Sequence, residues 1–407
     1  MKELITTPNT HCHISHGLES KLSNSLVLLF AVACGLSVAN VYYAQPLLDA
    51  LSLEFSISNA AIGSVITLTQ IGCALALLFL VPLGDKIERK KLMLLQLVAL
   101  VISLIVVGMA KTPMTLMIGM LAVGMLGTAM TQGLIAYAAS SSSLSDQGRV
   151  IGTAQSGVFI GLLLSRTFSG LISDLVGWRG VYICSAILML SIAYPLSRRL
   201  PNLNVMTKDI KYHQLIFSLF YLLKEQKVLQ VRGLLALLMF AAFNIFWSAI
   251  VIPLSDAPFN YSRTVIGSLG LVGAIGALVA SKSGGWADRG YGKQVSFYAL
   301  VILILAWFPI SLISWSIWAL IVGIILLDAG GQALHVTNQS MIYRTKPEAN
   351  SRMISLYMMF YAIGSGLGAI SSTAMYAYAG WNGVCILGAL VSVFALIIWG
   401  ITRNRSF

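Results

Sequence analysis

The chain has 407 residues, of which 57% are apolar and only 10% are charged. Soluble globular proteins have about 45–50% apolar and about 25% charged residues, so this composition excludes a water-soluble enzyme with an ordinary surface. It also excludes a disordered chain, which needs low hydrophobicity and high charge. A mean hydropathy of +0.85 places most of the chain in lipid, and the net charge of +12 must then be interpreted from its distribution over the loops.

Twelve apolar segments follow one another along the chain, and a helix needs about 20 such residues to cross a bilayer. They lie near residues 25–44, 60–82, 91–109, 114–137, 150–173, 180–197, 232–253, 264–286, 295–313, 316–342, 353–376 and 381–401. Because a helix satisfies its own backbone hydrogen bonds in lipid, we predict an all-α membrane protein with twelve transmembrane helices. Residues 1–24 are polar, and we expect no cleavable signal peptide there.

Lysine and arginine fall on alternate loops. Of the 26, 21 lie in the tails, in the central segment and in the loops after the second, fourth, eighth and tenth segments. The opposite loops hold Lys111, Arg179 and Arg263 only. The positive-inside rule therefore predicts that both termini are cytoplasmic. The basic charge is a topology signal, and we expect no nucleic-acid partner.

The central stretch 198–231 is the only long polar segment between spans. We take it as the boundary between two bundles of six helices. The predicted organisation is a cytoplasmic tail, an N-terminal bundle, a cytoplasmic central loop, a C-terminal bundle and a second tail, at residues 1–24, 25–197, 198–231, 232–401 and 402–407.

The two halves match at a single shift of 203 residues. This shift joins Asp85 to Asp288, Arg149 to Arg352, Gly161 to Gly364, and the Gly-Trp dipeptide at 177–178 to the one at 380–381. Six helices plus six in the same orientation form a parallel repeat. Transporters built in this way bind their substrate near the midplane of the membrane, between the halves.

The loop after the second span carries a signature. Residues 81–90, VPLGDKIERK, resemble the motif G-x-L-a-D-r-x-G-r-k of the major facilitator superfamily, with Val81 and Glu88 in place of glycines. A second copy at 284–293 keeps Gly284, Asp288 and Arg289. The resemblance covers the whole chain and points to the bacterial drug-efflux-like branch, through residues 44–48, 164–167 and 328–339. It implies two parallel six-helix repeats and secondary transport by alternating access.

The fifth helix departs from the pattern of the superfamily's proton antiporters, which often carry G-x-x-x-G-P-x-x-G-G. Gly157 and Gly161 fit, but Leu162 replaces the proline, and Ser165 and Arg166 replace the last two glycines. Antiport therefore has less support than membership of the superfamily.

The tenth span carries a polar stripe. Asp328, Gln332, His335 and Gln339 are spaced i, i+4, i+7 and i+11, which places them on one helical face, and Asn338 flanks them. A carboxylate at the centre of a membrane helix costs about 2.5–3.5 kcal/mol on insertion scales, so this face should meet a cavity or a partner. The alternative is a polar clasp between helices. His335 is a proton relay or a neutral hydrogen-bond donor to substrate.

Arg166 lies in the fifth span, about 12 Å from its end, which is too deep for its side chain to reach the interface. Asp328 lies at a similar depth, and two buried opposite charges are least costly when paired. We predict that Asp328 carries the coupling proton, that Arg166 holds it deprotonated when substrate is absent, and that His335 belongs to the same site. The alternative is a permanent structural salt bridge.

In the resembled family, helices 1, 4, 7 and 10 line the central cavity. Aromatic and amide side chains there suit an amphipathic organic ligand, although each aromatic could instead serve packing or an interface belt. The predicted substrate-binding residues are Asn40, Gln132, Asn244, Trp247, Gln332, Asn338, Gln339 and Tyr361.

Acidic and basic residues at the cytoplasmic helix ends are predicted to form the gate. By the repeat, Asp85 should approach the start of the eleventh helix near Arg352, and Asp288 the start of the fifth near Arg149, with Arg89 beside Asp85. A carboxylate at a helix N-terminus gains about 0.3–1 kcal/mol from the helix dipole. These contacts should exist only when the cytoplasmic side is closed.

The sequence thus predicts a monomeric, multi-pass transporter of the inner membrane that exports a small amphipathic compound in exchange for protons. The alternatives are proton-coupled uptake of a sugar or organic acid, and a membrane-embedded hydrolase using Asp328 and His335. We expect no catalytic centre, cofactor or metal. The sequence GSGLGA at 364–369 lies inside an apolar helix, the histidines at 11–16 lie in a polar tail, and no GxxxxGK[ST] motif is present.

Overall fold

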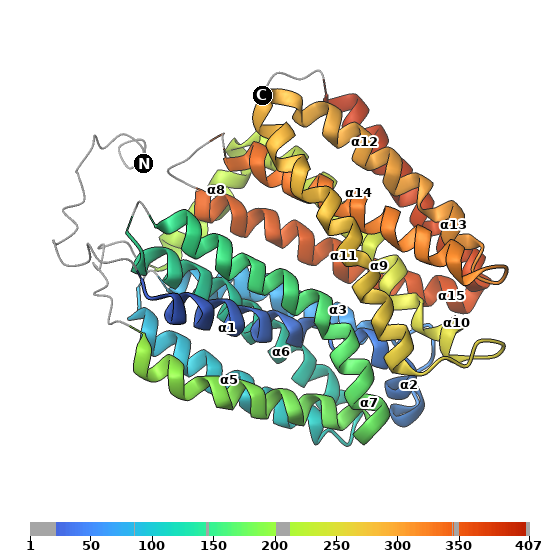
Figure 1. Ribbon diagram of the computed structural model, residues 1–407, viewed down its shortest axis with the longest axis horizontal. Coiled ribbons are helices and arrows are strands. Elements are labelled where there is room, and N and C mark those ends of the chain that lie inside the picture. The colour runs from blue at the N-terminus through green and yellow to red at the C-terminus, as the bar shows by residue number, and fades with distance from the viewer. Residues whose placement is uncertain are drawn as a thin grey trace.

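The structure is a computed structural model that describes residues 22–84, 86–143, 146–200, 212–343, 345 and 350–403. The described residues are almost entirely helical, and the long helices run roughly side by side (Figure 1). The end of the bundle at which α1 begins and α15 ends is called the terminal end below, and the opposite end is called the far end.

The first half of the chain forms a bundle of long helices with short helical pieces between them. Its elements are α1 (Asn24–Tyr42), η1 (Gln45–Leu47), α2 (Leu48–Phe55), α3 (Ser64–Leu75), η2 (Ala76–Leu80), α4 (Val81–Leu83), α5 (Arg89–Gly108), α6 (Pro113–Ser141) and α7 (Gln147–Arg199).

The second half has the same plan, preceded by a helix in the central segment. Its elements are α8 (Tyr212–Glu225), α9 (Lys227–Ala249), α10 (Val251–Ser255), α11 (Arg263–Trp286), η3 (Ala287–Tyr291), α12 (Gly292–Leu305), α13 (Trp307–Ser311), α14 (Ile317–Tyr343) and α15 (Asn350–Thr402).

Eight helical segments of the described chain are long and apolar enough to cross a membrane, and two shorter apolar helices lie at Asn24–Ala39 and Arg263–Gly276. Two of the eight, Gln147–Arg199 and Arg352–Thr402, are more than 50 residues long and cross twice. Each turns at a glycine with positive φ, Gly177 at 81° and Gly380 at 61°, a conformation that glycine adopts without strain. The predicted all-α fold with twelve crossings is confirmed, and the two turns differ by the repeat shift of 203 residues.

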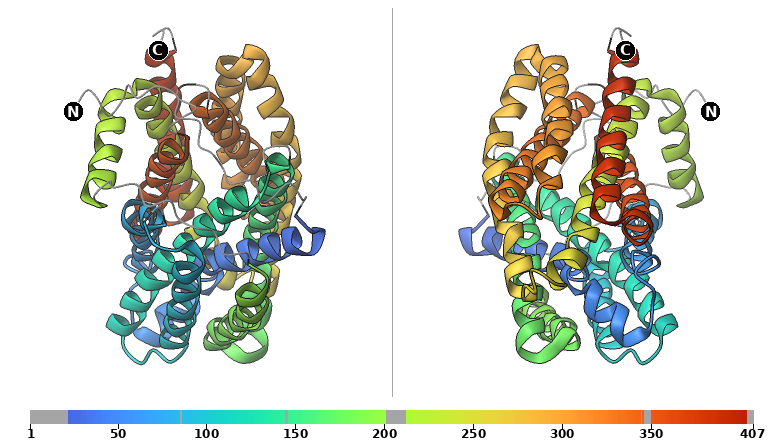
Figure 2. Two further views of the ribbon diagram at one scale, coloured as in Figure 1. Left: turned by 90° about the vertical axis from the view of Figure 1, so that its left-hand side faces the viewer. Right: turned by 90° about the vertical axis from the view of Figure 1, so that its right-hand side faces the viewer.

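The packing of the helices repeats as well. In the first half α1 packs along α7 and α3 along α6, while in the second half α9 packs along α15 and α11 along α14. The halves meet where α7 contacts α11 and where α3 contacts α15. In both views of Figure 2 the blue-to-green first half lies below the yellow-to-red second half. The two six-helix repeats are therefore two bodies with matching interiors and a two-sided interface.

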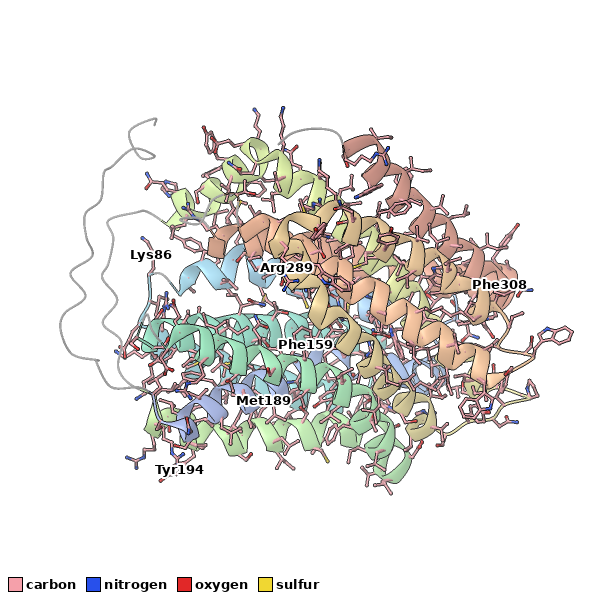
Figure 3. All side chains as sticks on the ribbon, turned by 45° about the horizontal axis from the view of Figure 1, so that its top comes forward. Lys86, Phe159, Met189, Tyr194, Arg289 and Phe308 are labelled. Atoms are coloured by element: carbon pink, nitrogen blue, oxygen red, sulfur yellow. The ribbon has the colours of Figure 1, made fainter. Side chains whose placement is uncertain are left out.

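The outer faces of the bundle are apolar. Phe308 and Tyr194 are 71% and 70% exposed and point away from the helices, whereas Met189 is fully buried (Figure 3). A surface of this kind is costly in water, because large exposed apolar patches on soluble monomers are rare. Lipid is the solvent that these faces fit.

The central segment contains helix α8. It buries Leu219 and Leu222, while Phe217 and Phe220 are exposed. Its apolar residues run almost unbroken from 215 to 223 between polar flanks. The helix contacts both halves, because Tyr212 Oη donates to the Phe79 carbonyl and Ser218 Oγ accepts from Arg352 Nη1 at 3.2 Å.

Glycines set the closest helix contacts inside each half. A Cβ at Gly157 of α7 would lie 2.0 Å from the Ala31 carbonyl oxygen, and one at Gly161 would lie 2.2 Å from that of Gly35. The repeat partner of Gly161 is Gly364 on α15, where a Cβ would lie 2.0 Å from the Leu237 carbonyl oxygen of α9. The backbones touch at these points, as in other small-residue contacts of membrane helices.

We expect Gly157→Ala to lower stability by about 1–3 kcal/mol, because the added methyl group forces α1 and α7 apart. Gly152→Ala on the same helix is the matched control, since no atom lies within 4 Å of its added Cβ. Thermal unfolding in detergent measures both. Equal melting temperatures for the two variants would contradict the close α1–α7 contact.

Candidate functional site

Arg166 of α7 occupies the interface between the halves. Its side chain is 2% exposed, and its Nε donates to Gln45 Oε1 at 2.7 Å. The guanidinium lies 4.1 Å from the ring centroid of Trp247, and rings of this kind attract cations through their faces. Gln45 Nε2 donates in turn to Asn244 Oδ1 at 3.2 Å. Arg166 thus links Gln45 of the first half to Trp247 of α9, and Gln45 itself is bonded to Asn244 of the same helix.

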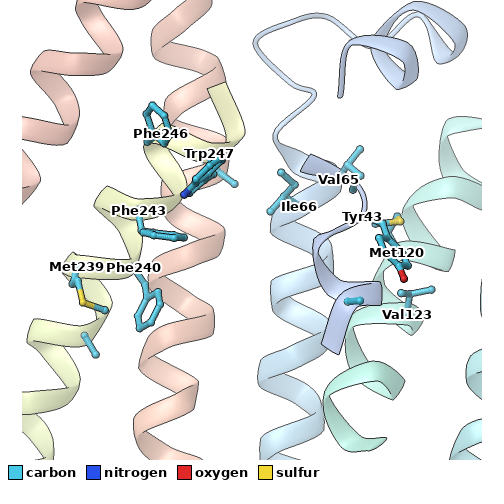
Figure 4. Packing of buried hydrophobic residues seen from close by; sticks show 14 of the residues in the cluster. Tyr43, Val65, Ile66, Met120, Val123, Met239, Phe240, Phe243, Phe246 and Trp247 are labelled. Carbon is cyan, nitrogen blue, oxygen red and sulfur yellow. The ribbon is translucent and has the colours of Figure 1, made fainter. Parts of the chain in front are cut away.

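The aromatic side of this site comes from α9. Phe240, Phe243 and Trp247 lie one after another along the helix (Figure 4). Phe240 packs edge-on against Tyr361, with ring centroids 4.0 Å apart, and Tyr361 forms a hydrogen bond with Tyr42 of the first half. Of the predicted substrate-binding residues, Asn244, Trp247 and Tyr361 therefore come together around Arg166.

Asp328 of α14 also packs against α11, whose glycines let both charges approach its backbone. A Cβ at Gly270 would lie 3.2 Å from Arg166 Cδ, and one at Gly273 would lie 2.8 Å from Asp328 Cγ. Positions three residues apart are neighbours on a helix surface. Arg166 and Asp328 therefore flank adjacent turns of α11.

The predicted ion pair between Arg166 and Asp328 is not formed in this conformation. No nitrogen of Arg166 lies within 4.0 Å of the carboxylate, because Gln45 and the Trp247 ring hold the guanidinium. Asp328 is 5% exposed, and its Oδ2 has no hydrogen-bond partner. Arg166 Nη2 is also buried without a partner. Both groups retain hydrogen-bonding capacity that the protein does not use here.

The polar stripe of α14 divides between two neighbours. Asp328 faces α11, whereas His335 Nδ1 is bonded to Tyr357 Oη of α15 at 2.8 Å. Gln339 Nε2 lies 3.3 Å from His335 Nε2, and the Gln332 side chain is half-buried with its Oε1 unpartnered. The stripe is thus one helical face, but it does not form one cluster.

Asn40 is not part of the cluster. It is fully buried, and its amide nitrogen donates to the Leu36 carbonyl at 2.7 Å while its amide oxygen accepts from Ser185 at 2.7 Å. Both partners belong to the first half. The structure therefore gives Asn40 a satisfied position inside the first bundle, away from Arg166.

A cavity opens at the terminal end between the halves. Its volume is about 90 Å³, and its walls include Arg89, Gln96 and Gln132 of the first half, Leu219 of α8 and Arg352 of α15. Gln132, predicted to bind substrate, thus lies with Arg89 and Arg352, predicted to act in gating.

The predicted gate is described only in part. Asp85 lies outside the described residues, as does the side chain of Asp288. Arg149 forms an ion pair with Asp146 at 2.7 Å and donates to Asn24 Oδ1 at 2.8 Å, both within the first half. Arg89 Nη1 donates to the Ala136 carbonyl at 3.1 Å, again in its own half.

The far end is closed by contacts that join the halves. Arg263 at the start of α11 forms an ion pair with Asp49 of α2 at 2.6 Å, and the Thr264 backbone N–H donates to Asp174 of α7 at 2.8 Å. On the other side of the interface, Thr67 Oγ1 donates to the Gly366 carbonyl at 2.8 Å. In the described conformation these contacts hold the halves together at the far end, while the cavity lies at the terminal end.

Sequence reasoning missed two arginines of this arrangement. Arg263 falls among the loop charges, although it bridges the halves, and Arg232 begins the apolar segment that follows the basic central stretch, although it is 7% exposed inside the second half. The position of Arg232 at the edge of an apolar run is the signal that could have separated it from the solvated basic residues.

A family model described as Major Facilitator Superfamily matches residues 27–229 and 232–406. The chain belongs to the Major Facilitator Superfamily. It is 39% identical over 379 residues to the uncharacterized transporter YgaY of Escherichia coli O157:H7, across 93% of this chain and 96% of that one. The multidrug resistance protein MdtG of Escherichia fergusonii is 25% identical across 84% and 85% of the two chains.

Among solved structures, a bacterial homolog of the human lysosomal transporter Spinster, in an inward-facing and occupied conformation, aligns with a TM-score of 0.73. The two chains are 14% identical over 94% of this one and 97% of that one, so this likeness concerns the fold. As a superfamily member, the chain is a secondary transporter and a multi-pass membrane protein rather than an enzyme.

We expect Arg263→Gln to open the far end more often, because a transporter of this superfamily must break the Asp49 ion pair to expose that side. The probe is the substitution Thr67→Cys in a cysteine-free background. Its thiol should then react with a maleimide several-fold faster, since loss of about 1 kcal/mol from the closed state shifts the population about five-fold.

Arg179→Gln is the matched control. Arg179 also lies at the far end, but its partner Glu54 belongs to the same half. The hydrogen bond from Trp178 Nε1 lowers the pKa of Glu54, so this pair stays charged at neutral pH. Labelling of the probe thiol at the same rate in both variants would show that the Asp49–Arg263 pair does not hold the far end closed.

Proposed function

We propose that this transporter exports a small amphipathic organic compound in exchange for protons, as a monomer in a bacterial inner membrane with both termini in the cytoplasm. The observation that carries the proposal is Asp328, a buried carboxyl group near the middle of α14 with one unpartnered oxygen and no cation within 4.0 Å among the described residues. Ionisable residues at such depth mark ion or substrate pathways.

Coupling follows from the competition for Arg166. Burial favours the protonated form of a carboxyl group, and a nearby guanidinium favours the carboxylate. A substrate that moves beyond the terminal-end cavity to stack on Trp247, which does not line that cavity, would displace Arg166 from the ring toward Asp328, one turn away along α11. The proton on Asp328 would then leave to the cytoplasmic side as the substrate binds. His335, bonded to Tyr357, would pass protons or orient the substrate.

The substrate site we propose combines the aromatic wall of α9 with half-buried polar side chains. It takes Gln132, Asn244, Trp247, Gln332, Gln339 and Tyr361 from the predicted set, and Asn40 acts through the packing of the first half. Aromatic faces with a few polar groups favour an amphipathic organic ligand. The name of MdtG, a multidrug resistance protein, supports export of such compounds.

We further propose that the terminal end is the cytoplasmic side and that Asp85, Arg89, Asp288, Arg149 and Arg352 draw together when it closes. In the described conformation the Arg89 and Arg352 side chains line the open cavity. Closure would bring these helix ends into contact, while the far-end pair of Asp49 and Arg263 separates.

Asp328→Asn should abolish transport driven by a pH gradient and leave counterflow exchange of the same compound intact, because an amide keeps the shape of the carboxyl group but carries no exchangeable proton. The assay uses proteoliposomes and a panel of 2-naphthoate, 2-naphthylmethylamine and 2-naphthylmethanol, with protein-free liposomes as the baseline for passive distribution.

Asp256→Asn is the control, since Asp256 is an exposed carboxyl group between α10 and α11. Accumulation against a gradient by Asp328→Asn at the wild-type rate would exclude Asp328 as the coupling group. Wild-type movement of every compound without dependence on the pH gradient would exclude proton coupling altogether.

A further inference from the structure

A second buried cation lies inside the second half, near the terminal end. Arg232 of α9 is 7% exposed, and its Nη1 donates to Ser296 Oγ of α12 at 2.9 Å and to Asn338 Oδ1 of α14 at 3.2 Å. Within the described part of the chain these are its only hydrogen bonds, and no carboxylate there lies within 4.0 Å of it. Among the described residues this buried charge therefore has no counter-ion, an arrangement that is strongly unfavourable.

Several hydrogen-bond donors at the Arg232 site have no acceptor among the described residues. Asn338 is fully buried, and its Nδ2 has no partner. The Ser296 hydroxyl donates its hydrogen to the Gly292 carbonyl at 2.7 Å, so its oxygen is used as the acceptor for Arg232. Among the described residues, Arg232 Nε and Nη2 make no hydrogen bond, and neither does Asn338 Nδ2. Such a set of unused donors around a fixed positive charge suits an anion and rejects a cation.

Phe240 lies two turns beyond Arg232 on the same helix, α9, or about 12 Å along the axis. Its ring centroid is 5.2 Å from that of the half-buried His335 and 4.0 Å from that of Tyr361, which contacts Tyr42 of the first half. An elongated molecule could therefore place its charged end at Arg232 and its apolar body against Phe240.

We propose that Arg232 and Asn338 bind the carboxylate of the transported compound, so that the substrate class is amphipathic organic anions. This inference rests on the proposed function and adds the chemistry of its substrate. A planar guanidinium binds a carboxylate through two parallel hydrogen bonds, which an ammonium group cannot reproduce. The identity of Arg232, and not only its charge, should therefore matter.

The test is equilibrium binding to the purified full-length transporter in phosphatidylcholine nanodiscs, followed by calorimetry with 2-naphthoate and with neutral 2-naphthylmethanol. Wild type should bind the carboxylate at least tenfold more tightly than the alcohol. Arg232→Gln should remove this preference, and Arg232→Lys should restore only part of it. Lys227→Gln is the matched control, because Lys227 is a more exposed cation at the start of the same helix.

Asn338→Asp is a second variant that keeps the test valid if Arg232→Gln fails to fold. The new carboxylate would pair with Arg232, keep the bundle neutral at this point and repel 2-naphthoate, so anion binding should fall at least tenfold while the melting temperature is maintained. Unchanged 2-naphthoate affinity in either variant, or equal affinity for the alcohol, would overturn the proposal. Loss of the Arg232-dependent binding in phosphatidylglycerol nanodiscs would assign the donors to a lipid headgroup and would also overturn it.

Transport assays separate this proposal from the proposed function. If wild type moves 2-naphthoate through Arg232 without using a pH gradient, the anion site stands and proton coupling fails. If a pH gradient drives 2-naphthylmethylamine equally in wild type and Arg232→Gln, coupling stands and the anion site fails.

Discussion

The cost of leaving polar groups unpaired in a dry interior is the constraint on which this structure depends. Most buried hydroxyl groups meet it locally, as Ser37 and Thr131 do by donating to the carbonyl four residues earlier. Other buried polar groups lack a partner among the described residues. Arg166, Asp328 and Asn338 each keep a buried polar atom of this kind, and our proposals assign protons or ligands to them.

Glycines allow the helix backbones of the two halves to approach closely beside the buried charged side chains. A Cβ at Gly267 of α11 would lie 2.3 Å from the Arg166 carbonyl oxygen, and one at Gly170 of α7 would lie 2.1 Å from that of Arg263. At these two points the α7–α11 interface is thus backbone against backbone. Two such surfaces can part and meet again without repacking large side chains, which is what a rocking motion between two halves requires.

The fold could be predicted from the sequence further than the site could. Hydropathy and the shift of 203 residues predicted the twelve crossings and related the two glycine turns at 177 and 380. Periodicity also placed Asp328 and His335 on one face of α14. It could not show that Asp328 packs on α11 while His335 bonds to Tyr357, because the partner of a side chain depends on which helices become neighbours. The environment of Arg232 could not be predicted for the same reason, since its neighbours come from α12 and α14.

The charges of Arg166, Asp328 and Arg232 connect recognition with the driving force. With Asp328 protonated and no substrate bound, these three residues together carry two positive charges. With a carboxylate at Arg232 and Asp328 ionised, the residues and the bound carboxylate together are neutral. In the proposed cycle the protein turns from outward-facing to inward-facing in the first state and back to outward-facing in the second. Each cycle therefore moves two positive charges into the cell for each anion exported. Each charge gains about 2.3 kcal/mol per 100 mV of membrane potential. Under both proposals export of an anion would be driven by the membrane potential as well as by the pH gradient. Because both gradients favour outward movement of an anion, the anion site in the second half would fit an exporter better than an importer.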